Sequence, residues 1–318
     1  MKINKQYVLR TLFFLIGLVI LFWGLSKIFD PKDNAEGYGM SNISAAGILG
    51  EDVNTVDVVF IGDSEAWAGV SPLNVYEKYG ITSYNCATPG QQLFYTESIL
   101  EALLERQHPS VVFLEAEVFF TEQQAADLAE EYLGRVFPLF EYHNRWKSLK
   151  LRDFTGERYY SYKDPNKGFN FFKDADPLEE VPDHMADTGQ VEPIPLLNRF
   201  VIKQIQRICE ENNIELVLFR VPNVTDWSYA KYNAVNEYAA QEDLPFIDLN
   251  LEFADAMDWK QDTRDKGAHL NYSGALKVTN YLADYMHEHF TLQDHRQDEK
   301  FVSWDEALKT FKEINGLD

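Results

Sequence analysis

The stretch Asp57-Val-Val-Phe-Ile-Gly-Asp-Ser64 decides the expected fold, because a short apolar run ends abruptly in three turn residues. Residues 58–61 are β-branched or aromatic, which is typical of a parallel strand that is buried on both faces. In open α/β sheets, ligands bind at the carboxyl ends of the strands. Ser64 follows such an end, and we therefore expect it at the edge of the sheet where a site would form.

Further apolar runs alternate with helical segments along the chain. The predicted strands cover residues 83–85, 110–115, 214–221 and 245–249. The predicted helices cover residues 72–79, 91–107, 196–212, 227–241 and 272–289. Strands and helices that alternate with short connections form a parallel sheet covered by helices. The sequence thus predicts a three-layer α/β/α sandwich with a parallel five-stranded sheet.

Residues 135–195 interrupt this alternation, because they lose clear periodicity while carrying many aromatic side chains. A structureless loop of that length is uncommon inside a compact domain. We expect an insertion that packs over the top of the sheet, with a lid as one form of it. Its aromatic residues are expected to form a local core, and a platform that stacks on sugars is the alternative.

Residues 11–29 form an apolar stretch that is long enough to cross a membrane. As a helix the stretch spans about 28 Å, close to a bilayer core of about 30 Å. It is preceded by Lys2, Lys5 and Arg10 and followed by Asp30, Asp33 and Glu36. This charge distribution places the N-terminus in the cytoplasm and the rest outside the cell membrane. A cleaved signal peptide is the competing interpretation, but the apolar run of a signal peptide is usually shorter than residues 11–29.

The expected organisation has four parts. Residues 1–29 are a cytoplasmic stub with a single-pass anchor, and residues 30–54 are a juxtamembrane linker. Residues 55–290 form the α/β domain with the insertion 135–195, and residues 291–318 form a charged tail with one helix.

The composition and motifs of the chain argue against nucleic-acid, zinc and nucleotide ligands. The formal net charge is -22, with 51 acidic and 29 basic residues, and such a surface repels nucleic acid, since phosphate binding needs clustered Lys and Arg. Cys86 and Cys209 lie far apart, without the Cys/His spacing of a zinc site, and a single bridge between them stays open. No glycine-rich nucleotide-binding motif occurs. We predict no cofactor, no metal and no nucleic-acid partner.

The segment Asp265-Lys-Gly-Ala-His269 precedes the last predicted core helix and offers what a nucleophilic Ser64 needs. A base must reach the proton of the nucleophile, and a third group should orient the base. His269 is the candidate base and Asp265 the candidate acid, with Asp262 in reserve. The backbone N–H of Ser64 is a candidate oxyanion donor. The alternative is that Asp265 and His269 merely cap the final helix.

With these motifs the chain resembles the SGNH/GDSL hydrolase superfamily, and within it the branch near alginate O-acetyltransferases and the teichoic-acid D-alanyl transfer protein. The similarity covers roughly residues 55–290. It is carried by residues 57–64, 71–72, 80–85, 90–91, 109–115 and 267–275. The resemblance implies that Ser64 is the nucleophile, His269 the base and the Gly90 N–H a second oxyanion donor.

The sequence departs from the superfamily pattern at two places. The third block usually ends its strand with Gly-x-Asn-Asp, whose Asn completes the oxyanion hole, whereas this chain has Glu115-Ala-Glu117. The triad Asp usually lies three residues before the His, whereas Asp265 lies four before His269. Asn85, Glu115 and Asn223 are retained as candidate substrate-binding residues.

The resemblance and the outward-facing anchor together favour an extracytoplasmic serine acyltransferase. It would acetylate a cell-surface or exported polysaccharide through an acyl-enzyme on Ser64. In similar systems a membrane-bound O-acyltransferase delivers the acyl group, so the expected partners are an acyl donor, a glycan acceptor and such a membrane protein. The alternatives are an esterase that acts on glycans or lipids, and a catalytically weak binding or assembly module of the cell envelope.

Overall fold

The computed structural model describes residues 5–40 and 42–317. Residues 1–4, which include Lys2 of the predicted basic flank, lie outside the described residues, as do Ser41 of the predicted linker and Asp318 of the predicted tail. The chain divides into two compact units. We call Met1–Ile43 with Gln124–Tyr162 the anchor unit, and Ser44–Gln123 with Lys163–Asp318 the sheet unit.

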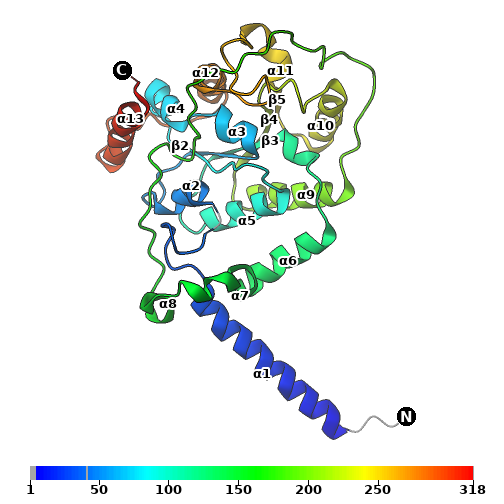
Figure 1. The fold of residues 1–318 in the computed structure, drawn as a ribbon, viewed down its shortest axis with the longest axis vertical. Helices are drawn as coiled ribbons and strands as arrows, with labels where there is room; N and C mark the ends of the chain where they lie inside the picture. The colour runs from blue at the N-terminus through cyan, green and yellow to red at the C-terminus, as the bar shows by residue number, and fades with distance from the viewer. Residues whose placement is uncertain (1–4, 41, 318) are drawn as a thin grey trace. The chain divides into compact units, whose positions relative to one another are not determined.

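The sheet unit is built on five parallel strands in the order β2-β1-β3-β4-β5. The strands are β1 (Val58–Ile61), β2 (Ser83–Asn85), β3 (Val111–Glu115), β4 (Glu215–Arg220) and β5 (Phe246–Asp248). Every residue of β1 and β3 is fully buried, because helices cover both faces of the sheet. The predicted three-layer sandwich with a parallel five-stranded sheet is confirmed (Figure 1).

Helices on the two faces supply the outer layers. On one face α4 (Pro72–Tyr79) and α12 (Tyr272–His289) pack together, and on the other face α5 (Leu93–Leu103) packs on α9 (Leu196–Glu211) (Figure 1). The core between them is aromatic in part, since the Phe60 and Phe113 rings stack with centroids 5.1 Å apart. The unit also contains α2 (Ile43–Ala46), α3 (Ser64–Gly69), α10 (Tyr229–Glu242), α11 (Leu249–Glu252) and α13 (Val302–Asn315).

The predicted insertion 135–195 is divided between the two units at Tyr162. Its first part, residues 135–162, contains the end of α6 (Ala125–Val136) and the whole of α7 (Pro138–Tyr142) and α8 (Leu151–Thr155). These helices belong to the same unit as α1 (Lys5–Phe29) and not to the unit of the sheet. Its second part, residues 163–195, contains no helix or strand in the described structure and belongs to the sheet unit.

Helix α1 has the length and apolar composition that the sequence predicts for residues 11–29. Helix α1 is long and apolar enough to cross a membrane, by length and composition, and none of its apolar window is buried. An N-terminal helix of this kind is a candidate membrane span or signal sequence.

Cys86 and Cys209 are both free and buried, so the disulfide bridge that the sequence left open is not formed.

Candidate active site

Ser64 is the first residue of α3 and follows the carboxyl end of β1 at a turn that requires glycine. Gly62 has a φ of 150°, and a Cβ at this position would lie 2.4 Å from Cβ of Glu115. Asp63 then caps the helix, because its Oδ1 accepts a hydrogen bond from the Glu65 N–H at 3.2 Å. The turn thus holds the Ser64 side chain at the edge of the sheet, as the sequence predicts.

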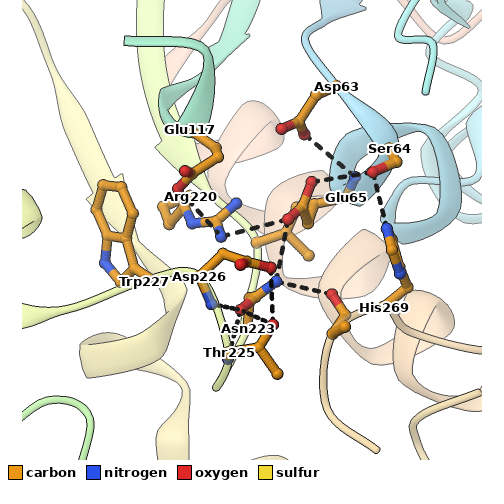
Figure 2. A network of polar contacts seen from close by, with 12 residues as sticks. Asp63, Ser64, Glu65, Glu117, Arg220, Asn223, Thr225, Asp226, Trp227 and His269 are labelled. Atoms are coloured by element: carbon orange, nitrogen blue, oxygen red, sulfur yellow. Dashed lines mark hydrogen bonds and ion pairs between the residues drawn. The ribbon is translucent and has the colours of Figure 1, made fainter. Parts of the chain in front are cut away.

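The Ser64 hydroxyl meets His269 directly. Ser64 Oγ lies 2.7 Å from His269 Nε2 (Figure 2), and His269 Nδ1 lies 2.5 Å from Asp265 Oδ2. The other carboxylate oxygen of Asp265 accepts a hydrogen bond from the His269 N–H at 2.6 Å, which fixes the backbone as well as the ring. The His269 and Asp265 side chains remain 23% and 39% exposed, so solvent and ligands can approach the three residues.

The segment that carries Asp265 and His269 folds back on itself. Thr263 pairs with Leu270 in an antiparallel bridge, and Lys266 and Gly267 at its tip have φ values of 59° and 94°. Two consecutive left-handed residues reverse the chain, so the carboxylate of Asp265 points back to the imidazole of His269. The turn explains how an acid four residues before the histidine still reaches its ring.

Asp262, the reserve acid, does not contact His269. Its carboxylate is buried, pairs with Lys277 Nζ at 2.6 Å and accepts hydrogen bonds from Ser273 Oγ and the Asp258 N–H, both at 2.7 Å. The structure therefore brings Asp265 and not Asp262 to the histidine. Asp265 and His269 do not cap the last core helix, because the side chain of Asn271 caps α12 by accepting a hydrogen bond from the Gly274 N–H.

Gly90 lies on the loop after β2, and that loop is tied to the turn before Ser64. Gly62 donates its N–H to Gln91 Oε1 at 3.1 Å, and its carbonyl oxygen accepts from the Thr88 N–H at 3.1 Å. Gly90 itself is exposed, has a φ of 63° and faces open space. The two hydrogen bonds therefore fix the loop that carries Gly90 to the turn before Ser64.

A buried arginine pairs with the glutamate that ends β3. Glu115 ends β3, and its Oε1 lies 2.5 Å from Nη1 of Arg220, which ends the neighbouring strand β4. Arg220 is fully buried, packs over the Trp227 ring at 4.8 Å and also faces Glu117 at 3.7 Å. Burial raises the pKa of Glu115 to about 7, although the Arg220 charge opposes this shift. Glu115 therefore faces a cation inside the protein and not a substrate.

Glu65 connects this cluster to Ser64. Its Oε2 lies 3.3 Å from Ser64 Oγ, and its Oε1 lies 3.6 Å from Arg220 Nη2 and accepts a hydrogen bond from Asn223 Nδ2 at 3.0 Å (Figure 2). Burial opposes ionisation of Glu65, but hydrogen bonding with Asp63 and the positive charge of Arg220 outweigh it and lower the pKa of Glu65 to about 2. An ionised carboxylate thus lies beside the Ser64 hydroxyl.

Sequence reasoning did not single out Glu65, and it left Arg220 without a role. A signal was present, because Glu115 ends one predicted strand and Arg220 is the last residue but one of the next predicted strand along the chain. Opposite charges at the same edge of a parallel sheet have a good chance of pairing when both are buried. The order of the strands, which the sequence does not state, decides whether they meet.

The three candidate substrate-binding residues are engaged inside the protein. Asn85 donates to the carbonyl oxygens of Ala66 and Val70 at 2.8 and 2.9 Å, and Asn223 donates to Glu65 and to the Ala268 carbonyl oxygen. Asn85, Glu115 and Asn223 are all fully buried. Buried side chains with partners inside the protein present no polar atoms to a ligand. We therefore do not regard these three residues as substrate-binding.

The raised pKa of Glu115 predicts a loss of stability with rising pH. In the unfolded chain a glutamate titrates near 4.5, whereas Glu115 in the fold titrates near 7. Between these values the native state binds more protons, so its stability falls as pH rises, by about 3 kcal/mol at most. Glu65 titrates below this window, because its pKa is about 2.

Glu115→Gln should reduce the slope of unfolding free energy against pH between pH 4.5 and 7. Chemical denaturation of the full chain in detergent micelles, followed by tryptophan fluorescence at several pH values, measures that slope. Burial also raises the pKa of Asp63 and Glu117, so part of the slope should survive in the variant. An unchanged slope would contradict the assignment of the shift to Glu115.

Comparison with known proteins gives structural similarity without sequence similarity. No family model and no curated protein matches the chain. Among solved structures, the psychrotrophic esterase EstA from Pseudoalteromonas sp. is similar at 11% identity and a TM-score of 0.40, over 73% of this chain and 97% of that one. A family 3 carbohydrate esterase from Clostridium thermocellum has 15% identity and a TM-score of 0.37, over 75% and 96%. A lipase/acylhydrolase from Enterococcus faecalis has 14% identity and a TM-score of 0.33, over 75% and 99%.

Proposed function

We propose that this chain is a serine enzyme that forms an acyl-enzyme on Ser64. One observation carries the proposal, namely the unbroken series of contacts from Ser64 Oγ through His269 to the Asp265 carboxylate. A nucleophile within hydrogen-bond reach of a base, which is itself oriented by a third group, is the arrangement that nucleophilic catalysis needs. The same contacts speak against a binding module without catalysis, because a binding site has no need of an oriented base.

The geometry suggests the following sequence of proton transfers. His269 Nε2 removes the proton of Ser64 as Oγ attacks the carbonyl carbon of an acyl donor, and Asp265 stabilises the imidazolium that forms. In this proposal the amides of Ser64 and Gly90 donate hydrogen bonds to the developing oxyanion. Collapse of this intermediate breaks the bond to the leaving group, which takes the proton from His269, and leaves the acyl group on Ser64.

The second half of the reaction releases the acyl group. His269 deprotonates an incoming hydroxyl, which attacks the acyl-enzyme and regenerates free Ser64. We propose that this hydroxyl belongs to a cell-surface or exported polysaccharide and that the acyl group is acetyl. The apolar helix α1 supports a membrane-anchored enzyme with the sheet unit outside the cell, and a membrane-bound O-acyltransferase would be the source of the acyl group.

Hydrolysis is the second candidate, and one observation favours it. The partial exposure of His269 and Asp265 leaves the site open to water, which can replace the sugar hydroxyl in the second step. An esterase that removes acyl groups from glycans or lipids would use the same three residues. The two functions differ only in the acceptor that reaches the acyl-enzyme.

A two-step experiment tests the proposal and separates the candidates. The full chain in detergent micelles is mixed with p-nitrophenyl acetate, and intact mass spectrometry is used to look for acetyl-Ser64. Oligosaccharide acceptors are then added, and acetylated sugar is measured against free acetate. Acetylated sugar supports the transferase, and free acetate alone supports the esterase. If no acyl-enzyme forms and no ester is turned over, the serine-enzyme proposal fails.

Asp265→Asn should lower kcat by about 10⁴-fold, because an amide neither favours the correct imidazole tautomer nor stabilises the imidazolium. Asp262→Asn is the matched control, since it removes a carboxylate that contacts Lys277 and Ser273 but not His269. The control should lose stability and retain kcat. Steady-state turnover of p-nitrophenyl acetate at a temperature where both variants are folded gives the comparison. A larger loss of kcat in the Asp262 variant would reverse the assignment of the acid.

A further inference from the structure

The carboxyl end of helix α1 packs against residues 137–145 of the anchor unit. The Phe22 ring lies 6.1 and 5.3 Å from the rings of Phe137 and Phe140, which flank the start of α7. The Leu139 N–H donates to Ser26 Oγ, and the Arg145 guanidinium donates to the Phe29 carbonyl oxygen. Figure 1 shows α7 and α8 beside the carboxyl end of α1. These contacts cover the last two turns of α1, a length of about 10 Å.

The apolar surface of α1 extends into this region. Large apolar side chains are exposed along α1 from Tyr7 to Trp23, and Lys27 Nζ lies 3.7 Å over the Trp23 ring. A tryptophan with a neighbouring lysine is typical of the boundary between the acyl chains and the headgroups of a bilayer. That boundary coincides with the part of α1 on which α7 packs.

The segment that follows α7 exposes apolar side chains where a soluble surface would bury them. Trp146, Leu151 and Phe154 are 63%, 89% and 57% exposed, although they lie within nine residues of one another. Exposed apolar side chains gathered in one short segment mark an interaction surface.

The same segment has a charge that contrasts with the rest of the chain. Residues 138–155 contain Arg145, Lys147, Lys150 and Arg152 against Glu141 and Asp153, whereas the whole chain has a net charge of -22. Arg145 and Asp153 form a buried pair at 2.7 Å, which leaves Lys147, Lys150 and Arg152 as the more exposed cations. Basic residues interleaved with exposed tryptophan, leucine and phenylalanine suit a surface of anionic phospholipids.

We propose that residues 138–155 lie on the surface of the bilayer that α1 spans. Trp146, Leu151 and Phe154 enter the boundary between headgroups and acyl chains, and the lysines and Arg152 contact lipid phosphates. A bilayer is the occupant because α1 brings it there: the contacts from Phe22 to Phe29 hold this segment within about 10 Å of the point where α1 leaves the acyl chains. The inference rests on the membrane-spanning role of α1, which is part of the proposed function, and it does not depend on catalysis by Ser64.

Spin labels at three positions test the proposal on the full chain in vesicles of phosphatidylcholine and phosphatidylglycerol. A nitroxide is attached to Leu151→Cys, to Leu196→Cys or to Ile16→Cys, one position at a time. Leu196 is the matched control, because it is the first residue of α9 in the sheet unit and is 85% exposed. Cys86 and Cys209 are buried, and burial raises the pKa of both thiols, so the label reacts with the introduced cysteine.

Collision with oxygen, which partitions into lipid, and with a water-soluble nickel chelate measures the surroundings of each label. We expect at least a tenfold higher ratio of oxygen to nickel collisions at position 151 than at position 196, with position 16 higher still. Equal ratios at 151 and 196, or a label at 151 that neither reagent reaches, would overturn the proposal. The second result would point to a protein partner. A low ratio at position 16 would refute the span by α1 itself, and none of these results bears on the acyl-enzyme experiment.

Discussion

Ser64→Ala should abolish acyl-enzyme formation and lower kcat for an activated ester by about 10⁶-fold, as removal of a serine nucleophile does in hydrolases. The physical reason is that Ser64 Oγ lies 2.7 Å from His269 Nε2, and alanine leaves no hydroxyl there for the base to deprotonate. Intact mass spectrometry after exposure to p-nitrophenyl acetate, together with steady-state release of p-nitrophenol, measures both effects. A small residual turnover above that of buffer alone is the expected result, because substrate binding and the oxyanion donors remain in the variant.

Ser83→Ala provides the control for the chemistry of the substitution. Ser83 is fully buried on β2, and its hydroxyl has no hydrogen-bond partner in the described structure, so its removal should leave kcat unchanged. If Ser64→Ala kept more than about a hundredth of the wild-type kcat, Ser64 would not be the nucleophile. That activity is far above the residual kcat that remains when a nucleophile is removed. The acyl group would then have to be sought on another side chain by peptide mapping.

Arg220→Met should have the largest effect on stability. Arg220 lies between three carboxylates, with Glu115 at 2.5 Å, Glu65 at 3.6 Å and Glu117 at 3.7 Å. Methionine keeps much of the volume but leaves Glu115 and Glu65 buried without this cation, whereas Glu117 keeps Lys231 at 2.6 Å. Removing one partner of a buried ion pair costs about 3–5 kcal/mol of unfolding free energy. Chemical denaturation of the full chain in micelles at pH 7.5 measures the loss.

Two comparisons isolate the charge of Arg220 as the cause. Arg207→Met removes an arginine whose side chain is 62% exposed and pairs only within its own helix, so it should cost about 0.5 kcal/mol or less. Adding Glu115→Gln to Arg220→Met should recover part of the loss, because it removes one unpaired charge. The loss should also shrink at pH 5, since the unpaired carboxylates take up protons in the fold. A loss that is independent of pH would mean that packing against Trp227, and not charge, explains the effect.

The Arg220 cluster and the catalytic residues meet at Glu65, which follows Ser64 in the chain. The carboxylate of Glu65 contacts Ser64 Oγ on one side, and Arg220 and Asn223 on the other. The buried ion pairs therefore fix the position of the Glu65 carboxylate beside the Ser64 hydroxyl. Removal of Arg220 is expected to disturb the position of Ser64 as well as the stability of the sheet unit.

Local patterns determined the architecture and the main residues of the site. The apolar runs that end in turn residues identified five parallel strands, because a strand buried on both faces must be apolar along its whole length. Ser64 followed from the turn after the first run, and His269 from its place before the last core helix. These features depend on residues that are close together in the chain, and a sequence displays such patterns directly.

Tertiary structure alone decided the partners of the charged residues and the division of the insertion. The choice of Asp265 over Asp262 depends on the left-handed turn at Lys266 and Gly267 and on Lys277, which occupies the carboxylate of Asp262. The Arg220 cluster depends on β3 and β4 being neighbours in the sheet, and the grouping of residues 124–162 with α1 depends on contacts across more than a hundred residues. Electrostatic pairing and packing are set by distance in space, which the order of residues along the chain does not contain.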